Sequence, residues 1–149
     1  MSHIPPRQKV WCGSVKGEYK HSIDAKGRLA MPAKLRDTLG DRFTITKGRD
    51  GCLYAYPEQE WQAFEQRLKA LGGSEKARRT QRYYMAKAID VELDAQGRVL
   101  IRADLREFAG LQKDVTVVGM MDRAEIWDSE RWNAYNDQSD EDDLEDVDF

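Results

Sequence analysis

The chain has 149 residues, of which 40% are hydrophobic and 34% are charged, and its formal net charge is −3 at pH 7. This composition is typical of a soluble protein with one ordinary domain or two very small halves that share a core. The apolar run VTVVGMM is too short to span a membrane, and the first residues lack the apolar core and cleavage site of a signal peptide. We therefore expect a cytoplasmic protein without membrane contact.

The sequence contains no motif typical of a metal site or of an active site. The only cysteines are Cys12 and Cys52, the only histidines are His3 and His21, and their spacing matches no zinc-binding motif. The chain also lacks a phosphate-cradling glycine loop and a nucleophile–histidine pair. The sequence therefore predicts no metal site, no cofactor and no catalytic residues.

Charge is distributed unevenly along the chain. The segment 137–149, DQSDEDDLEDVDF, has eight acidic residues and no basic residue, which leaves 24 basic against 19 acidic residues in 1–136, a net charge of +5. A basic body with an acidic tail is frequent in proteins that bind nucleic acid, although such a tail can also serve solubility alone. We expect an N-terminal extension at 1–13 and a disordered acidic tail at 137–149.

The chain contains an internal repeat. Residues 24–40 and 94–110 can be aligned without a gap, and RFTIT at 42–46 then corresponds to DVTVV at 114–118 with a small change of offset. Such a likeness over this length indicates a duplication. Eight of the 17 aligned positions are identical: Asp24/Asp94, Ala25/Ala95, Gly27/Gly97, Arg28/Arg98, Ala33/Ala103, Leu35/Leu105, Arg36/Arg106 and Gly40/Gly110.

Each copy is predicted to begin with a short strand, EYKHSI or IDVEL, that leads into a tight turn. In the turn, the carboxylate of Asp24 or Asp94 can accept hydrogen bonds from backbone N–H groups ahead of it. Gly27 or Gly97 supplies the positive φ that the turn requires. These four residues are therefore expected to be structural.

A second strand, RLAM or RVLI, starts at Arg28 in copy one and at Arg98 in copy two. Leu29 and Met31 share one face of this strand, whereas Arg28 lies on the other face. A short helix follows, and Pro32 suits its first turn.

Beyond this helix, DRFTITKGRDGCLYAY predicts two strands around a glycine-rich turn. A helix starting near Pro57 follows and ends at a pair of glycines, after which Ser74 can cap the helix EKARRTQRYYMAKA. The first of these helices places four large side chains on one face: Trp61, Phe64, Leu68 and Leu71.

These elements predict an α+β fold with a module at 18–60, linker helices at 61–87 and a second module at 88–131. Each module has about four strands, and a sheet this small cannot cover its own apolar face. We therefore expect two half-barrels joined about a pseudo-two-fold axis.

Two functional interpretations of the Asp-x-x-Gly-Arg turn remain open from spacing alone. An arginine at the end of a rigid hairpin can grip a phosphate, or contact guanine in the major groove, which admits a two-stranded β-ribbon. Alternatively, the arginine only pairs with Asp24 or Asp94 to brace the turn. An enzyme acting on an anionic small molecule would need a deep polar pocket around one of these aspartates.

The chain resembles the MraZ family of bacterial transcriptional regulators, members of the AbrB-like swapped-hairpin superfamily. The resemblance covers roughly residues 14–136. It is carried by KGEYKHSIDAKGRLAMPAKLR, GDRFTITKGRDGCLYAYPEQEW, VELDAQGRVLIRADLREFAG and AEIWDSERW. Copy two departs from the family pattern, because Arg102 occupies the position of Pro32 and weakens the start signal of the short helix.

The resemblance implies tandem AbrB/SpoVT-like swapped-hairpin half-barrels that form a double-ψ-like β-barrel within one chain, with flanking helices. It further implies a ring-shaped homo-oligomer, with an octamer as one candidate size. Its partner would be double-stranded DNA carrying short G-rich direct repeats in its own promoter, upstream of the division and cell-wall gene cluster, which it usually represses.

The family's DNA-contacting arginine corresponds to Arg28, with Lys26 beside it, and Arg98 is the matching position in copy two. Lys16 and Lys20 complete the expected DNA-binding set. Residues 16–40 have six basic and three acidic residues, whereas 86–110 have four and five. We therefore expect copy one to bind DNA and copy two mainly to support it, in a nucleoid-associated protein.

The linker helices are expected to leave aromatic faces at Trp61, Phe64 and Tyr83 that another chain could cover, which favours a closed oligomer.

A ring-forming interaction or scaffold protein, with incidental DNA contact, is the alternative function.

Deleting 137–149 tests the role of the acidic tail. If the tail competes with DNA for the basic surface, its removal raises affinity for random DNA at low salt more than affinity for a specific site. Filter binding or fluorescence titration on both DNAs measures this difference. Unchanged affinity for both would leave solubility as the role of the tail.

Overall fold

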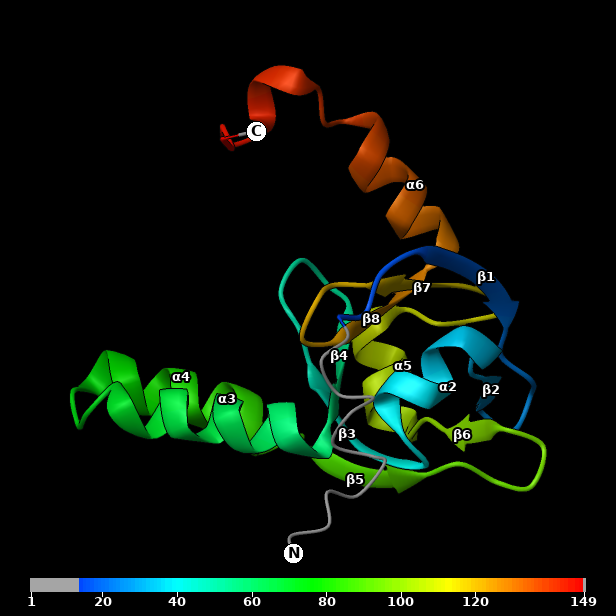
Figure 1. Cartoon of the computed structure of the whole chain (residues 1–149), viewed down its shortest axis with the longest axis horizontal. Helices are drawn as coiled ribbons and strands as arrows, with labels where there is room; N and C mark the ends of the chain where they lie inside the picture. Colours follow the sequence, from blue (N-terminus) through cyan, green and yellow to red (C-terminus); the bar gives the residue numbers. More distant parts are fainter. Residues whose placement is uncertain (1–13, 149) are drawn as a thin grey trace, which may run out of the picture.

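The computed structural model describes residues 14–148, so the N-terminal extension expected at 1–13 lies outside the described residues. The fold is α+β, with a six-stranded antiparallel sheet, a separate two-stranded ribbon and helices around them (Figure 1). Copy one comprises β1 (Glu18–Ser22), β2 (Arg28–Ala30), α2 (Ala33–Leu39), β3 (Arg42–Lys47), β4 (Leu53–Pro57), α3 (Glu58–Ala70) and α4 (Glu75–Met85). Copy two comprises β5 (Ile89–Glu92), β6 (Arg98–Leu100), α5 (Ala103–Ala109), β7 (Asp114–Gly119), β8 (Ala124–Asp128) and α6 (Ser129–Asp137), followed by a 3-10 turn η1 (Glu141–Asp143).

The two copies exchange their first strands. The sheet order is β1-β7-β8-β4-β3-β5, so β1 of copy one pairs with β7 of copy two, and β5 of copy two pairs with β3 of copy one. The registers match as well, because Tyr19 lies opposite Val117 and Ile89 lies opposite Ile45. Neither copy completes its sheet without the other.

A pseudo-two-fold axis relates the copies, and two pairs of equivalent residues mark it. In the ribbon, Leu29 of β2 lies opposite Val99 of β6. On the sheet, Tyr54 lies opposite Glu125, and each is the second residue of its strand, β4 or β8. Each pair joins equivalent positions of the two copies. The pseudo-two-fold axis therefore passes between the two residues of each pair.

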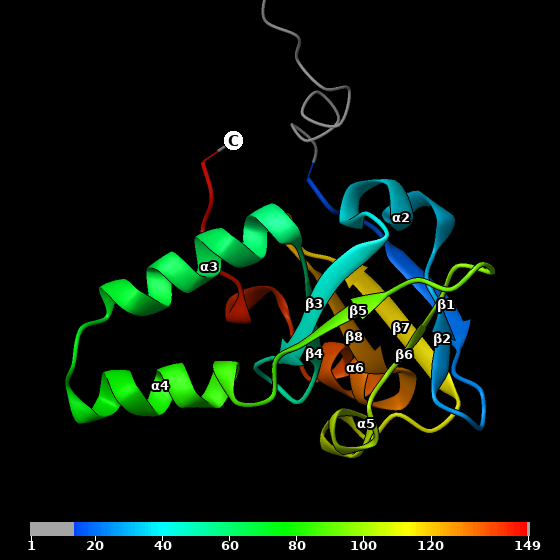
Figure 2. The same ribbon diagram turned by 90° about the horizontal axis from the view of Figure 1, so that it is seen from below.

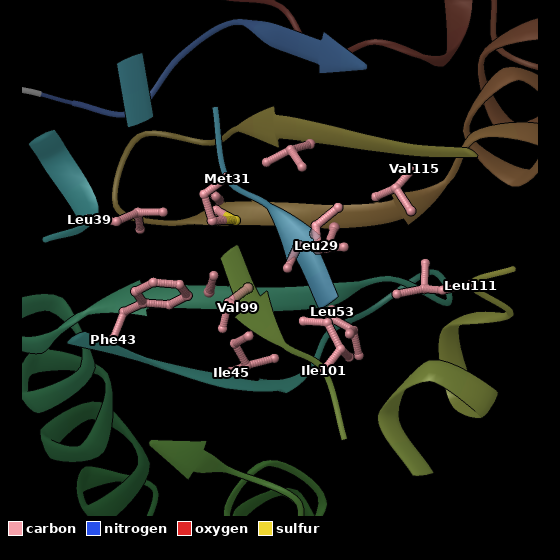
Figure 3. Packing of buried hydrophobic residues seen from close by; sticks show 14 of the residues in the cluster. Leu29, Met31, Leu39, Phe43, Ile45, Leu53, Val99, Ile101, Leu111 and Val115 are labelled. Carbon is pink, nitrogen blue, oxygen red and sulfur yellow. The ribbon is translucent and has the colours of Figure 1, made fainter. Parts of the chain in front are cut away.

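The core lies between the ribbon and the sheet. Leu29, Met31, Val99 and Ile101 are buried, and they pack among apolar side chains from β3, β4 and β7 (Figure 3). The alternation predicted from the sequence therefore places the apolar face of each second strand inward. This packing removes from water the apolar surface that neither copy could cover alone.

Helices α3 and α4 form a hairpin that projects from the strands (Figures 1 and 2). Ser74 starts α4 as predicted, because its Oγ accepts a hydrogen bond from the N–H of Ala77 at 3.1 Å. Leu71 does not join the buried face of α3, because the helix ends at Ala70 and leaves the Leu71 side chain exposed.

The expectation of uncovered aromatic faces on these helices is wrong for Trp61 and only partly right for Phe64 and Tyr83. Trp61 is buried, and Phe64 stacks on Tyr56 of β4 with ring centroids 5.0 Å apart. The hydroxyl of Tyr83 donates to the backbone oxygen of Gly48 at 2.7 Å. The sheet of the same chain therefore covers most of this aromatic surface.

Copy two differs after its last strand. Helix α6 occupies the place of α3, and its Trp132 and Tyr135 pack on Trp127 with ring centroids 5.2 and 5.3 Å away. The acidic tail then stands where copy one continues into α4. Across residues 14–148, no helix is long and apolar enough to cross a membrane.

Two leucines of the ribbon provide a matched test of this core. Leu29→Ala is expected to lower the free energy of unfolding by about 2–5 kcal/mol, because the buried side chain leaves a cavity. Leu100→Ala, at a side chain that is 58% exposed, is expected to change it by less than about 1 kcal/mol. Urea denaturation of both variants measures the difference, and equal losses would contradict the packing described.

Candidate nucleic-acid interface

The turn of copy one is built around the carboxylate of Asp24. Its Oδ1 accepts hydrogen bonds from the backbone N–H groups of Arg28 and Lys26, at 2.8 and 3.0 Å. Its Oδ2 accepts from Nε of Arg28 at 2.8 Å. Gly27 has φ +89°, a conformation that other residues rarely adopt. One carboxylate therefore shapes the turn and also orients the guanidinium.

Copy two repeats this arrangement. Oδ1 of Asp94 accepts from the backbone N–H groups of Arg98 and Gln96, each at 2.9 Å, and its Oδ2 accepts from Nε of Arg98 at 3.0 Å. Gly97 has φ +75°. The two turns are therefore equivalent in backbone and in the arginine that follows.

Each turn is held by the other copy. The N–H of Met31 donates to the backbone oxygen of Gly97 at 3.0 Å, and the N–H of Ile101 donates to that of Gly27 at 2.8 Å. These reciprocal bonds fix the two turns relative to each other.

Two further arginines, Arg36 on α2 and Arg106 on α5, cover the glycines of the turns. A Cβ on Gly97 would collide with the guanidinium of Arg36, and one on Gly27 would lie 2.8 Å from that of Arg106. Each arginine also donates from Nε to the backbone oxygen five residues before it, at 2.9 and 3.0 Å. Sequence reasoning assigned these arginines no role, although their identity in the repeat was the available signal.

Both turns lie on the side of the molecule away from the α3–α4 hairpin (Figures 1 and 2). Nη1 of Arg98 lies 3.9 Å from Oδ2 of Asp24, so the two turns are neighbours. Arg28 and Arg98 share the outer face of the ribbon, where Arg28 pairs with Leu100 and Arg98 with Ala30. The pseudo-symmetry thus places two arginines side by side on one surface.

The two guanidinium groups differ in how many partners they have. Nη2 of Arg98 donates to Oε1 of Gln96 at 2.6 Å, in addition to the bonds with Asp94. Within residues 14–148, the Nη groups of Arg28 form no hydrogen bond, and its side chain is 34% exposed against 28% for Arg98. Arg28 therefore keeps its terminal donors available to a ligand.

The expected lysines are not all near the turns. Lys26 is exposed in the turn itself, and Lys20 is exposed on β1, the strand that leads into it. Lys16 lies at the other end of β1, where its backbone packs against Gly119 at the end of β7. The structure therefore groups Lys26 with Arg28 and Arg98 and separates Lys16 from them.

Copy two neutralises part of its basic charge internally. Oδ1 of Asp104 accepts from Nε of Arg102 at 2.6 Å, and its Oδ2 accepts from Nζ of Lys87 at 3.2 Å. The hydrogen bond from Arg102 is the main reason that the pKa of Asp104 lies well below its usual range. Arg102 precedes the first residue of α5, so this pair stands where copy one uses Pro32.

The carboxylates of the turns stay ionised for a similar reason. The backbone N–H of Arg28 makes the largest contribution to lowering the pKa of Asp24, and that of Arg98 does so for Asp94. The charged carboxylate of each turn orients its arginine by accepting a hydrogen bond from Nε, and it does not occupy the Nη donors of that arginine.

Two copies of one strand–turn–strand–helix unit, with exchanged first strands and an arginine after each turn, define a duplicated α+β protein. The family model described as "MraZ protein, putative antitoxin-like" matches residues 15–83 and again 84–148. The chain belongs to the MraZ family.

Relatives agree over most of the chain. The Transcriptional regulator MraZ of Lachnoclostridium phytofermentans is 54% identical over 122 residues, which cover 80% of this chain and 86% of the relative. The proteins of the same name from Clostridium beijerinckii and Symbiobacterium thermophilum are each 51% identical, over 124 and 126 residues. These alignments cover 83% and 84% of this chain, and 87% and 91% of the two relatives.

The ionisation of Asp24 provides a test of the turn. Because its pKa is lowered in the folded state, its stabilising contribution is present above the unfolded pKa of about 3.9 and is lost as the pH falls through the lower, folded value. Asp24→Asn is therefore expected to be less stable than the wild type at pH 7, by an amount that shrinks below about pH 4. Urea denaturation as a function of pH measures this, with Asp37→Asn, an exposed site on α2, as the control. A deficit independent of pH would contradict the charge-based account.

Proposed function

We propose that this protein is a sequence-specific DNA-binding transcriptional regulator without catalytic activity, and that the paired turns and the β2–β6 ribbon contact double-stranded DNA. The observation that supports this most directly is the pair of adjacent arginine turns braced by each other. The relatives named Transcriptional regulator MraZ support the same class of function.

The chemistry of Arg28 favours guanine as a target. Asp24 binds its Nε, which orients the guanidinium plane and leaves the two Nη groups, a planar fork of donors, without a hydrogen-bond partner among residues 14–148. Such a fork matches O6 and N7 of guanine in the major groove, which is wide enough for a two-stranded β-ribbon. G-rich direct repeats in the protein's own promoter, ahead of the division and cell-wall genes, are the proposed operator, and repression is the proposed outcome.

Lys26 has a different role in this proposal. It is exposed in the turn next to Arg28 and has no rigid planar fork, so it contacts phosphates rather than bases. Lys20 extends the same positive surface along β1. Lys16 contributes only to the general field, because it lies at the far end of that strand.

The architecture proposed for the modules is a pair of AbrB/SpoVT-like swapped hairpins that close a double-ψ-like barrel. The pairing of β1 with β7 and of β5 with β3 supports it. Assembly into a ring of several copies would repeat the arginine surface and match tandem repeats in the DNA. The protein would then act in the cytoplasm, associated with the nucleoid.

The two copies contribute unequally to DNA binding. Both arginines bond through Nε to the aspartate of their own turn, but only Arg98 also bonds through Nη2, to Gln96. Asp104 of copy two in addition binds Arg102 and Lys87. Basic side chains that already form ion pairs within the protein gain less binding free energy from contact with a DNA phosphate, and their contact releases fewer counterions. Copy one is therefore the DNA-reading copy, and copy two supports it.

Operator titration of single variants tests this assignment. Arg28→Ala is expected to lose about 1–3 kcal/mol of binding free energy and most sequence preference. Arg98→Ala should lose less binding free energy than Arg28→Ala. Lys26→Ala should weaken binding to all sequences and reduce the slope of the logarithm of the binding constant against the logarithm of salt concentration by about one unit.

Each variant is first checked for an unchanged oligomeric mass. Equal losses for Arg28→Ala and Arg98→Ala would contradict the asymmetry. If the wild type bound a G-rich repeat and scrambled DNA with equal affinity across salt concentrations, a scaffold protein with incidental DNA contact would replace the proposal.

A further inference from the structure

Helix α4 of the α3–α4 hairpin carries a positive charge that the proposed DNA site does not use. Residues 75–85 hold four basic residues and one acidic residue, Glu75, a net charge of +3. The hairpin projects on the side away from the arginine turns (Figures 1 and 2). A DNA duplex lying on the turns would therefore leave this charge free.

The charge is concentrated on the outer face of α4. Ala77 and Tyr84 are the buried residues of this helix, whereas Arg78, Arg79 and Arg82 are exposed. Three and four residues are the spacings that share one helix face, so Arg78, Arg82 and the exposed Met85 form one stripe with Arg79 beside it. We call this surface the α4 stripe: Arg78, Arg79, Arg82 and Met85.

Most of this stripe lacks an acidic partner. Arg79 pairs with Glu75 at 2.9 Å, but both side chains are largely exposed, so the pair is weak. Nη1 of Arg78 donates to the backbone oxygen of Gly73 at 2.5 Å. Neither Arg78 nor Arg82 forms an ion pair with any residue in the described range 14–148.

The acidic tail has the complementary composition. It combines eight acidic residues with three apolar residues, Leu144, Val147 and Phe149. The side chains of Leu144 and Val147 are 68% and 69% exposed. A 3-10 turn with a capping box between Asp140 and Asp143 gives part of the tail a defined backbone. Between residues 138 and 148, no side chain forms an ion pair with the rest of the described chain.

The basic helix α4 and the acidic tail occupy equivalent places in the two copies. Helices α3 and α6 are equivalent, but copy one continues into the basic α4 and copy two continues into the acidic tail. In Figure 1 the tail extends from α6 and stands clear of the hairpin of its own chain. The arrangement leaves each segment facing outward, where a second copy can reach it.

We propose that the acidic tail of one copy binds the α4 stripe of a second copy. Carboxylates of 140–146 pair with Arg78, Arg79 and Arg82, for which guanidinium and carboxylate have matching geometry. Leu144 or Val147 packs against Met85. Because exposed ion pairs are individually weak, the contact depends on several of them together and weakens with salt. The contact requires a second copy but not DNA, so it stands or falls independently of the proposed DNA site.

A charge-reversal experiment tests whether the contact forms and whether it joins the tail of one chain to the α4 stripe of another. A photo-crosslinking residue replaces Val147 in three proteins: the wild type, a stripe variant Arg78→Glu/Arg82→Glu, and a tail variant Asp142→Lys/Asp143→Lys/Glu145→Lys/Asp146→Lys. Each protein is refolded alone, and the two variants are also refolded together. The yield of crosslinked chains joined at α4 peptides, measured by mass spectrometry, reports the contact.

The wild type is expected to give crosslinks between chains at α4, and each variant alone to give about tenfold less. The mixture should regain the yield, because the lysine tail of one variant then meets the glutamate stripe of the other, while neither chain matches itself. The double reversal Lys34→Glu/Lys113→Glu, at exposed lysines elsewhere, should leave the wild-type yield unchanged.

Three results would overturn the proposal. Crosslinks confined to one chain, with no recovery in the mixture, would place the tail on its own hairpin. Crosslinks at the arginine turns instead of α4 would make the tail a competitor at the DNA site. A wild-type yield at α4 that neither reversal changes would exclude a charge-driven contact.

Discussion

The rest of this structure depends on the reciprocal packing of the two second strands at the pseudo-two-fold axis. Leu29 and Val99 lie opposite each other in a ribbon whose apolar face fills the core. Neither module could bury this face alone, because the strand that closes each sheet comes from the other copy. The packing of the two copies on each other therefore also positions the paired turns.

This coupling makes the arginine surface rigid. The backbone of each turn bonds to the strand of the other copy, and the arginines of α2 and α5 cover the turn glycines. A binding side chain held on such a support loses little conformational entropy when it meets a ligand. The carboxylate of Asp24 extends this order to the guanidinium of Arg28, which explains how one short motif both shapes the turn and presents a charge.

Within this common framework the copies have diverged by charge. Copy two carries Gln96 where copy one has Lys26, and its Asp104 binds Arg102 and Lys87. The same divergence separates the basic α4 from the acidic tail that follows α6. Duplication thus supplies two equivalent positions on one scaffold, and we propose that these changes in charge allow one position to bind a polyanion while the other supports the fold or a second copy.

The sequence by itself determined the repeat, the order of strands and helices, the Asp-Gly turns, and which face of the second strand is buried. These features depend on local conformational preferences and on alternation along the chain, which residues such as Gly27 and Leu29 encode directly. Only the tertiary structure decided that β1 pairs with the other copy, that Arg36 covers Gly97, and that the sheet of its own chain buries Trp61. These contacts join residues far apart in the chain or depend on the packing of whole elements. Their partners follow from which arrangement buries the most apolar surface while satisfying the backbone, and no local pattern carries that information.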